Sequence, residues 1–104
     1  MPRFDVYANP DASDRNTIPF MLDVQNDFLG GLDTRVVVPL YVSSGFSTRA
    51  RNLNPEFNVA GQAVVMDTAS IGAVPVAELR RPVASLAGMR LDIQDALDTL
   101  FGSY

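Results

Sequence analysis

A change of hydrophobic period near the C-terminal end constrains the fold more than any other feature of the chain. After Gly88, apolar residues recur at helical spacing with polar residues between them: Met89, Ile93, Ala96, Leu97 and Leu100. This pattern predicts an amphipathic helix of about three turns, whose apolar stripe packs against a core. Gly102 follows at the position where helices commonly end in a left-handed residue. We therefore expect one C-terminal helix.

The chain before this helix has the period of β-strands. Apolar residues occupy alternate positions from Ile18 to Val24, and a β-branched run, Val36–Val38, lies in another segment. Strands are predicted at residues 4–8, 18–24, 35–42, 56–59 and 62–67. Residues 71–76 form an apolar run, and residues 78–88 fit either a short helical turn at Pro82 or extended chain. Short strands followed by one helix predict an α+β, mainly β fold, with the helix packed across a curved antiparallel sheet.

The length of 104 residues predicts a single domain covering residues 1–104. Hydrophobic residues make up 47% of the chain and charged residues 19%, a balance typical of globular rather than disordered proteins. No window approaches the roughly 20 apolar residues that cross a bilayer, and no basic segment precedes an apolar run at the N-terminus. We expect a cytoplasmic protein without a membrane partner.

The chain contains no His, Cys, Trp or Lys. Without His and Cys there is no serine-histidine-aspartate triad, no thiol nucleophile, no imidazole or thiolate zinc site and no disulfide. The net charge of −4 disfavours direct binding of nucleic acid, because such affinity comes largely from cationic groups. The composition therefore identifies no catalytic residue, cofactor or metal site.

Two groups of acidic residues are candidate sites. Asp23 and Asp27 are four positions apart, but one lies in a predicted strand and the other in a turn. We expect a solvated strand residue and a turn former, which do not share one site. Asp92, Asp95 and Asp98 form a stripe on the predicted helix that could hold a hard cation. A solvated helix face explains this stripe more simply, although acid near a helix C-terminus is unfavourable and hints at a basic partner.

Four arginines could form an anion site, because guanidinium groups match the geometry of phosphate and carboxylate. They are Arg49, Arg51, Arg80 and Arg81. Taken singly, each is an ordinary surface arginine.

Two apolar features are less easily placed in a core. Phe28 and Leu29 lie between a polar pair and two glycines, and Phe101 and Tyr104 lie at the end of the chain. Aromatic residues that are not fully buried are typical of interface anchors. A hydrophobic cap folded back onto the core is the alternative. On these residues alone, the chain is a small acidic interaction module.

At residues 22–27, which read LDVQND, the chain resembles the CcdB toxins, the gyrase-poisoning members of bacterial type II toxin-antitoxin pairs. Further landmarks recur in the same order over nearly the whole chain: Val6-Tyr7, the RVVVPL strand at 35–40, the DTAS turn at 67–70, and Asp92-Ile93 and Ala96-Leu97 before Phe101. Small insertions lie near residues 71–75 and before Ile18.

The resemblance implies a small barrel-like antiparallel sheet with a C-terminal helix, of the SH3-like type shared by CcdB and the MazF and Kid toxins. It also implies a homodimer that is not an enzyme and uses no cofactor. Such a toxin binds the A subunit of DNA gyrase, traps the cleaved gyrase-DNA complex and supports plasmid maintenance. A CcdA-like antitoxin, whose disordered segment orders on binding, neutralises it.

Carried over residue by residue, the resemblance implies a gyrase-binding set: Phe28, Leu29, Asp98, Phe101, Gly102, Ser103 and Tyr104. The family pattern ends Phe-Trp-Gly-Ile, so in ungapped register Gly102 stands where the family has tryptophan. A buried tryptophan anchor contributes roughly 2 kcal/mol or more to many interfaces. The missing tryptophan leaves open a homologue that has lost gyrase poisoning but still binds antitoxin. The related barrel fold leaves open a second alternative, a messenger-RNA endoribonuclease of the MazF and Kid type.

Overall fold

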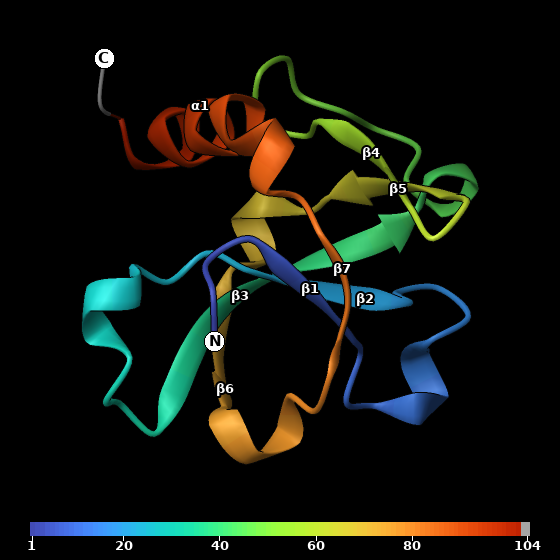
Figure 1. Cartoon of the computed structure of the whole chain (residues 1–104). Coiled ribbons are helices and arrows are strands. Elements are labelled where there is room, and N and C mark those ends of the chain that lie inside the picture. Colours follow the sequence, from blue (N-terminus) through green and yellow to red (C-terminus); the bar gives the residue numbers. More distant parts are fainter. Residues whose placement is uncertain (103–104) are drawn as a thin grey trace.

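The protein folds into a curled antiparallel sheet with one helix packed across it (Figure 1). The structure is a computed structural model that describes residues 1–102. Within these residues the strands are β1 (Asp5–Ala8), β2 (Phe20–Asp23), β3 (Thr34–Val42), β4 (Glu56–Val59), β5 (Gln62–Met66), β6 (Gly72–Pro75) and β7 (Pro82–Ser85), and the α-helix is α1 (Arg90–Phe101). The strand order is β4-β5-β3-β2-β1-β7, and β6 pairs with β3. This arrangement confirms the predicted mainly β, barrel-like fold with a C-terminal helix.

The long strand β3 organises the sheet, because it pairs with three others. One edge of β3 pairs with β2, while the opposite edge pairs first with β6 and then with β5. Pro39 lies where this second edge changes partner, and its carbonyl accepts a hydrogen bond from Asp67 N–H at 2.9 Å. The N–H and C=O groups of one strand residue point to the same edge of the strand. The N–H that Pro39 lacks would therefore point to the gap between β5 and β6, where neither strand needs it as a hydrogen-bond donor. Proline is tolerated within a sheet only at such a break in the ladder.

The sheet buries residues on both faces. The larger core lies between the sheet and α1, which contributes Ile93, Ala96 and Leu97. A smaller cluster on the other face contains Tyr7 and Leu79. Side chains of a strand alternate between the two faces, so neighbouring residues of β3 and β2 enter different clusters. Polar residues on the smaller face are therefore removed from solvent.

The segments that the sequence left open become extended chain. Residues 71–76 contain β6, and residues 78–88 contain β7, which begins at Pro82 and pairs with β1. Gly102 ends α1 with φ +75°, and its N–H donates to the Asp98 carbonyl at 2.9 Å, as predicted for this position. Within the part of the chain that is described, no helix is both long and apolar enough to cross a membrane.

Candidate functional site

The loop after β2 presents Phe28 to solvent. Asn26 opens a short 3-10 helix, Asp27–Leu29, and its side-chain oxygen accepts the Phe28 N–H at 2.9 Å. Asn and Asp side chains favour such turns because they satisfy backbone donors locally. The Phe28 side chain is 95% exposed and that of Leu29 is 50% exposed. The hydrophobic cap on the core, one of the two interpretations of this loop, is therefore wrong.

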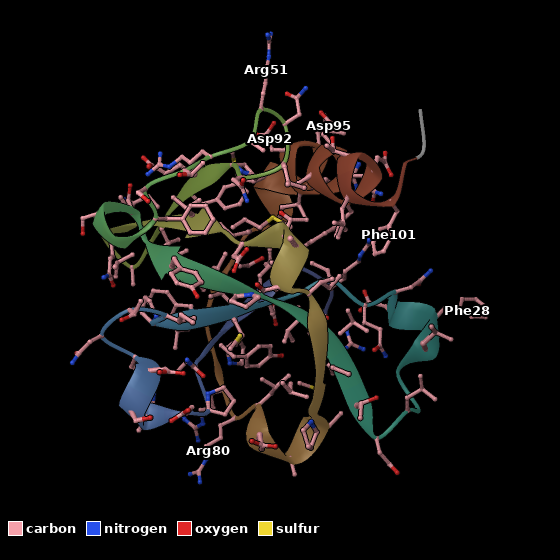
Figure 2. All side chains as sticks on the ribbon, turned by 180° about the vertical axis from the view of Figure 1, so that it is seen from behind. Phe28, Arg51, Arg80, Asp92, Asp95 and Phe101 are labelled. Carbon is pink, nitrogen blue, oxygen red and sulfur yellow. The ribbon has the colours of Figure 1, made fainter. Side chains whose placement is uncertain are left out.

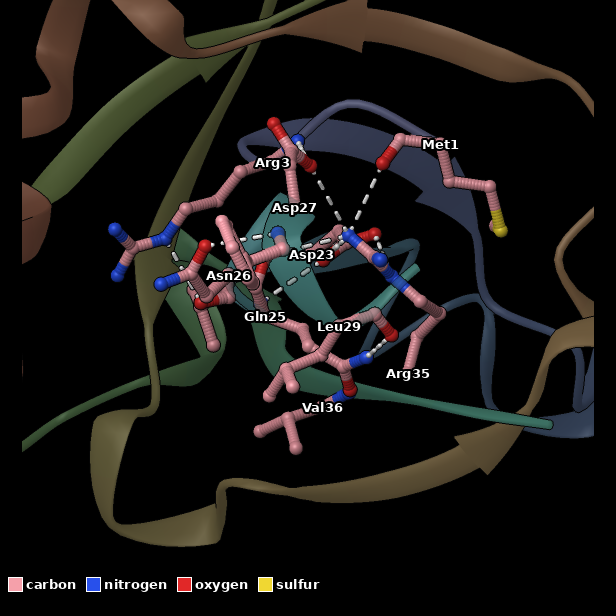
Figure 3. A network of polar contacts seen from close by, with 11 residues as sticks. Met1, Arg3, Asp23, Gln25, Asn26, Asp27, Leu29, Arg35 and Val36 are labelled. Atoms are coloured by element: carbon pink, nitrogen blue, oxygen red, sulfur yellow. Dashed lines mark hydrogen bonds and ion pairs between the residues drawn. The ribbon is translucent and has the colours of Figure 1, made fainter. Parts of the chain in front are cut away.

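A buried glutamine holds the loop against the sheet. Gln25 donates its amide N–H to the Leu29 carbonyl at 3.0 Å, and its side-chain oxygen accepts the Val36 N–H at 3.0 Å. The Gln25 side chain thus joins the end of the short helix to β3, as Figure 3 shows from close by. Because both polar ends of a buried amide are bonded, the loop is held in this position without an unsatisfied group.

The arginine at the start of β3 is almost fully buried beneath this loop. Arg35 donates to both carboxylate oxygens of Asp23, at 2.8 and 2.9 Å, and to the carbonyls of Met1 and Gln25 (Figure 3). Asp27 lies 3.6 Å from the same guanidinium. The expectation that Asp23 is solvated and separate from Asp27 is therefore wrong. Both carboxylates meet Arg35, because the second face of the sheet is covered.

Burial and charge in this cluster change its acid-base properties. Burial raises the pKa of Asp5, and repulsion from the neighbouring Asp23 raises it further. Burial likewise raises the pKa of Tyr7, with the Asp5 and Asp23 carboxylates adding to the effect. The hydrogen bond to Asp23 raises the pKa of Arg35. The cluster is therefore an internal ion pair in an acidic environment.

A second arginine joins the loop to α1. Arg3 donates its backbone N–H to Asp27 at 2.7 Å, its Nε to the Val24 carbonyl at 2.9 Å, and its Nη2 to Gln94 on α1 at 3.4 Å. Gln94 in turn donates to Asp98 at 3.1 Å. A surface hollow of about 330 Å³ lies between the two segments and is lined by Arg3, Val24, Gln25, Val36, Ile71, Gln94, Leu97, Asp98 and Phe101.

Two of the predicted binding residues, Asp98 and Phe101, line this hollow. Phe101 is 68% exposed at the end of α1, Gly102 is exposed and Asp98 is half-buried. Figure 2 shows Phe28 and Phe101 on the same side of the molecule. Ser103 and Tyr104 lie outside the described residues. Two segments far apart in the sequence thus form one surface, with exposed rings flanking a polar bridge.

The four arginines considered as an anion site do not form a comparable site. Arg49 pairs with Glu56 at 2.9 Å, and Arg51 lines the same hollow as this pair, whereas Arg80 and Arg81 line another. Figure 2 places Arg51 and Arg80 at opposite ends of the molecule, so the four arginines do not converge.

The acidic stripe on α1 does not form a metal site within residues 1–102. Asp92 and Asp95 are exposed there, and no group of three or more metal-ligating side chains is found in that part of the chain.

A family model described as CcdB protein matches residues 3–102 of the chain. The chain belongs to the CcdB family. The match covers the sheet, the Phe28 loop and α1 together, so the resemblance seen in the sequence is confirmed over almost its whole length. CcdB family membership makes the chain a toxin of a toxin-antitoxin system. A comparison with curated proteins gave no significant match.

Three residues that hold the Phe28 loop, β3 and α1 together were not singled out from the sequence. They are Arg3, Gln25 and Arg35. Arg35 had a recognisable signal, because a charged residue at the start of a β-branched run must either stay at the surface or find a buried partner. For Arg3 and Gln25 no local signal exists, since their partners come from distant segments.

Proposed function

We propose that this CcdB-family toxin binds the A subunit of DNA gyrase and traps the cleaved gyrase-DNA complex, without catalysing a reaction itself. The observation that carries the proposal is the Phe28 ring, 95% exposed on a loop held by two hydrogen bonds of the buried Gln25 side chain. Aromatic residues are enriched among the anchors of protein interfaces, so an exposed ring on a fixed loop is suited to contact a partner. The proposed gyrase-binding surface consists of Phe28, Leu29, Asp98, Phe101, Gly102, Ser103 and Tyr104.

Aromatic burial is the proposed source of the affinity. Burying a phenylalanine side chain contributes about 1.5–3 kcal/mol, which corresponds to roughly 10- to 100-fold in affinity. Phe28 and Phe101 together therefore supply the aromatic contacts of the proposed surface, without the further contact that the family tryptophan would add. Gly102 supports this assignment, because its left-handed backbone turns the chain out of α1 directly after Phe101.

The partners follow from family membership. We expect a homodimer in the cytoplasm, built from one domain per chain, which a CcdA-like antitoxin neutralises and which serves plasmid maintenance. No cofactor, metal, membrane or direct nucleic-acid contact is needed for this action, because the toxin acts on a protein surface. An open reading frame beside the gene, encoding a basic N-terminal segment and an acidic polar tail, would support the antitoxin partnership.

The decisive experiment is a gyrase cleavage assay. Purified protein is added to gyrase of the source organism with supercoiled DNA and ATP, and linear DNA is measured after denaturation of the enzyme. We expect linear DNA to accumulate with the wild type and to fall by at least about tenfold with Phe28→Ala. Leu91→Ala is the matched control, because Leu91 is 76% exposed on α1 and lies outside the proposed surface.

Three results would replace the proposal. Absence of linear DNA at every gyrase concentration, together with antitoxin binding, would identify a homologue that has lost gyrase poisoning. Specific cleavage of messenger RNA in cells that express the protein would identify an endoribonuclease. Equal activity of wild type and Phe28→Ala would place gyrase binding on another surface.

A further inference from the structure

Arg3 lies between the two apolar parts of the proposed gyrase-binding surface. Its Nε donates to the carbonyl of Val24, where the chain leaves β2 for the Phe28 loop. Its Nη2 donates to Gln94 on α1, one turn before Asp98. One side chain therefore contacts both the segment that bears Phe28 and the helix that ends at Phe101.

The guanidinium of Arg3 is held in place rather than free in solvent. It lies 4.7 Å from the centre of the Phe4 ring, at a distance where a cation is attracted to an aromatic face. It also lines the hollow to which Gln25, Asp98 and Phe101 contribute. Holding an arginine side chain in one conformation costs entropy. The two hydrogen bonds and the ring contact together offset this cost and keep the guanidinium of Arg3 in place.

We infer that Arg3 is a positioning residue for gyrase binding, which sets the Phe28 loop and the end of α1 in one arrangement. The inference rests on the proposed function and names a residue outside the proposed contact set. Its physical reason is preorganisation: a surface whose two halves are already aligned loses less conformational freedom on binding. This alignment depends on the Arg3 side chain and not on its backbone. The backbone N–H of residue 3 can still donate to Asp27 after any substitution except proline.

Substitutions at both ends of the bridge test this role. Arg3→Ala removes both side-chain hydrogen bonds, whereas Arg3→Lys keeps the charge but cannot reach two separate acceptors with a planar fork. Gln94→Ala removes the acceptor on α1 without changing the net charge. Arg51→Ala is the matched control, since it removes one exposed arginine far from Phe101 (Figure 2).

The affinity of each variant for the gyrase A subunit is measured by surface plasmon resonance, and its melting temperature by circular dichroism. We expect about tenfold weaker binding for Arg3→Ala, a smaller loss for Arg3→Lys and no change for Arg51→Ala. The double variant Arg3→Ala/Gln94→Ala should bind no more weakly than Arg3→Ala, because both changes break the same bridge. Binding by Arg3→Ala equal to wild type would overturn the inference, as would a loss that merely follows the fall in melting temperature.

Amide hydrogen exchange separates this inference from the proposed function. Faster exchange in Arg3→Ala, confined to residues 26–30 and the last turn of α1, is the expected result. If the wild type does not bind gyrase, the proposed function fails, and the exchange measurement still decides whether Arg3 aligns the two segments. Unchanged exchange in both segments would overturn the positioning role.

Discussion

Replacing Arg35 by methionine should remove a large part of the stability of the fold. The change keeps an unbranched side chain of similar length but deletes the guanidinium that bonds both oxygens of Asp23 at 2.8 and 2.9 Å. Asp23 is fully buried, and Asp5 and Asp27 lie close by. The variant therefore leaves a buried carboxylate without its cation, among other carboxylates.

The expected loss is about 3–5 kcal/mol, the usual cost of removing one partner of a buried ion pair. Native domains are stable by roughly 5–15 kcal/mol, so Arg35→Met should lose about a fifth of its free energy of unfolding or more. For a chain of this size, such a loss lowers the melting temperature by at least about 12 °C.

The free energy of unfolding is measured in urea by far-ultraviolet circular dichroism, with wild type, Arg35→Met, Asp23→Leu and the double variant. The double variant should be more stable than Arg35→Met, because it leaves no unpaired charge buried. Asp23→Leu should cost less than Arg35→Met, since Arg35 keeps Asp27 at 3.6 Å and two backbone carbonyls as partners.

Arg49→Met provides the matched control for this series. It breaks an ion pair with nearly the same distance, 2.9 Å, between side chains that are 39% and 46% exposed. Surface pairs contribute little, so the unfolding curve should stay within measurement error of the wild type. A loss below about 1 kcal/mol for Arg35→Met, or a double variant that loses the sum of both single changes, would refute the reasoning.

Three further predictions follow from single residues. Phe28→Ala should change stability by less than about 0.5 kcal/mol, since the ring is exposed, yet abolish growth inhibition on induction; a toxic variant would contradict this. Gly102→Ala should lower the free energy of unfolding by about 1 kcal/mol, because an L-residue is strained at φ +75° even where open space surrounds it. An unchanged melting temperature would contradict this and show that the last turn of α1 relaxes. Folding raises the pKa of Asp5, so its ionised carboxylate destabilises the fold at neutral pH. Asp5→Asn should therefore be more stable than wild type at pH 7, and the difference in stability should disappear as the pH falls below 3.8. A difference in stability that does not depend on pH would refute the assignment.

The strands and the helix could be predicted because their signals are local. The alternation around Leu22 and the helical spacing around Ile93 each depend on a few adjacent positions, and both elements lie close to their predicted limits. The alternation at β2 also suggested that Asp23 faces solvent. This was wrong because the chain around Leu79 covers the second face of the sheet, a contact between segments far apart in the sequence.

The same distinction applies to the candidate surface. The sequence could identify Phe28 as an unusual residue but could not choose between an exposed anchor and a buried cap. That choice depends on Gln25, which reaches from the loop to the Val36 N–H on β3. A hydrogen bond between two loops or strands leaves no periodic signal, so the geometry of the surface required the fold.

Asp27 connects the stability of the core to the geometry of this surface. Its carboxylate accepts the Arg3 N–H at 2.7 Å and lies 3.6 Å from the guanidinium of Arg35. Arg35 is buried and Arg3 is only partly buried, so the two arginines should have different effects when removed. Loss of Arg35 should reduce stability and gyrase affinity together, because the ion pair and the base of the Phe28 loop share it. Loss of the Arg3 side chain should reduce affinity with a smaller effect on stability, since its two hydrogen bonds are only partly buried. Measuring both quantities for both variants therefore separates folding of the toxin from alignment of its binding surface.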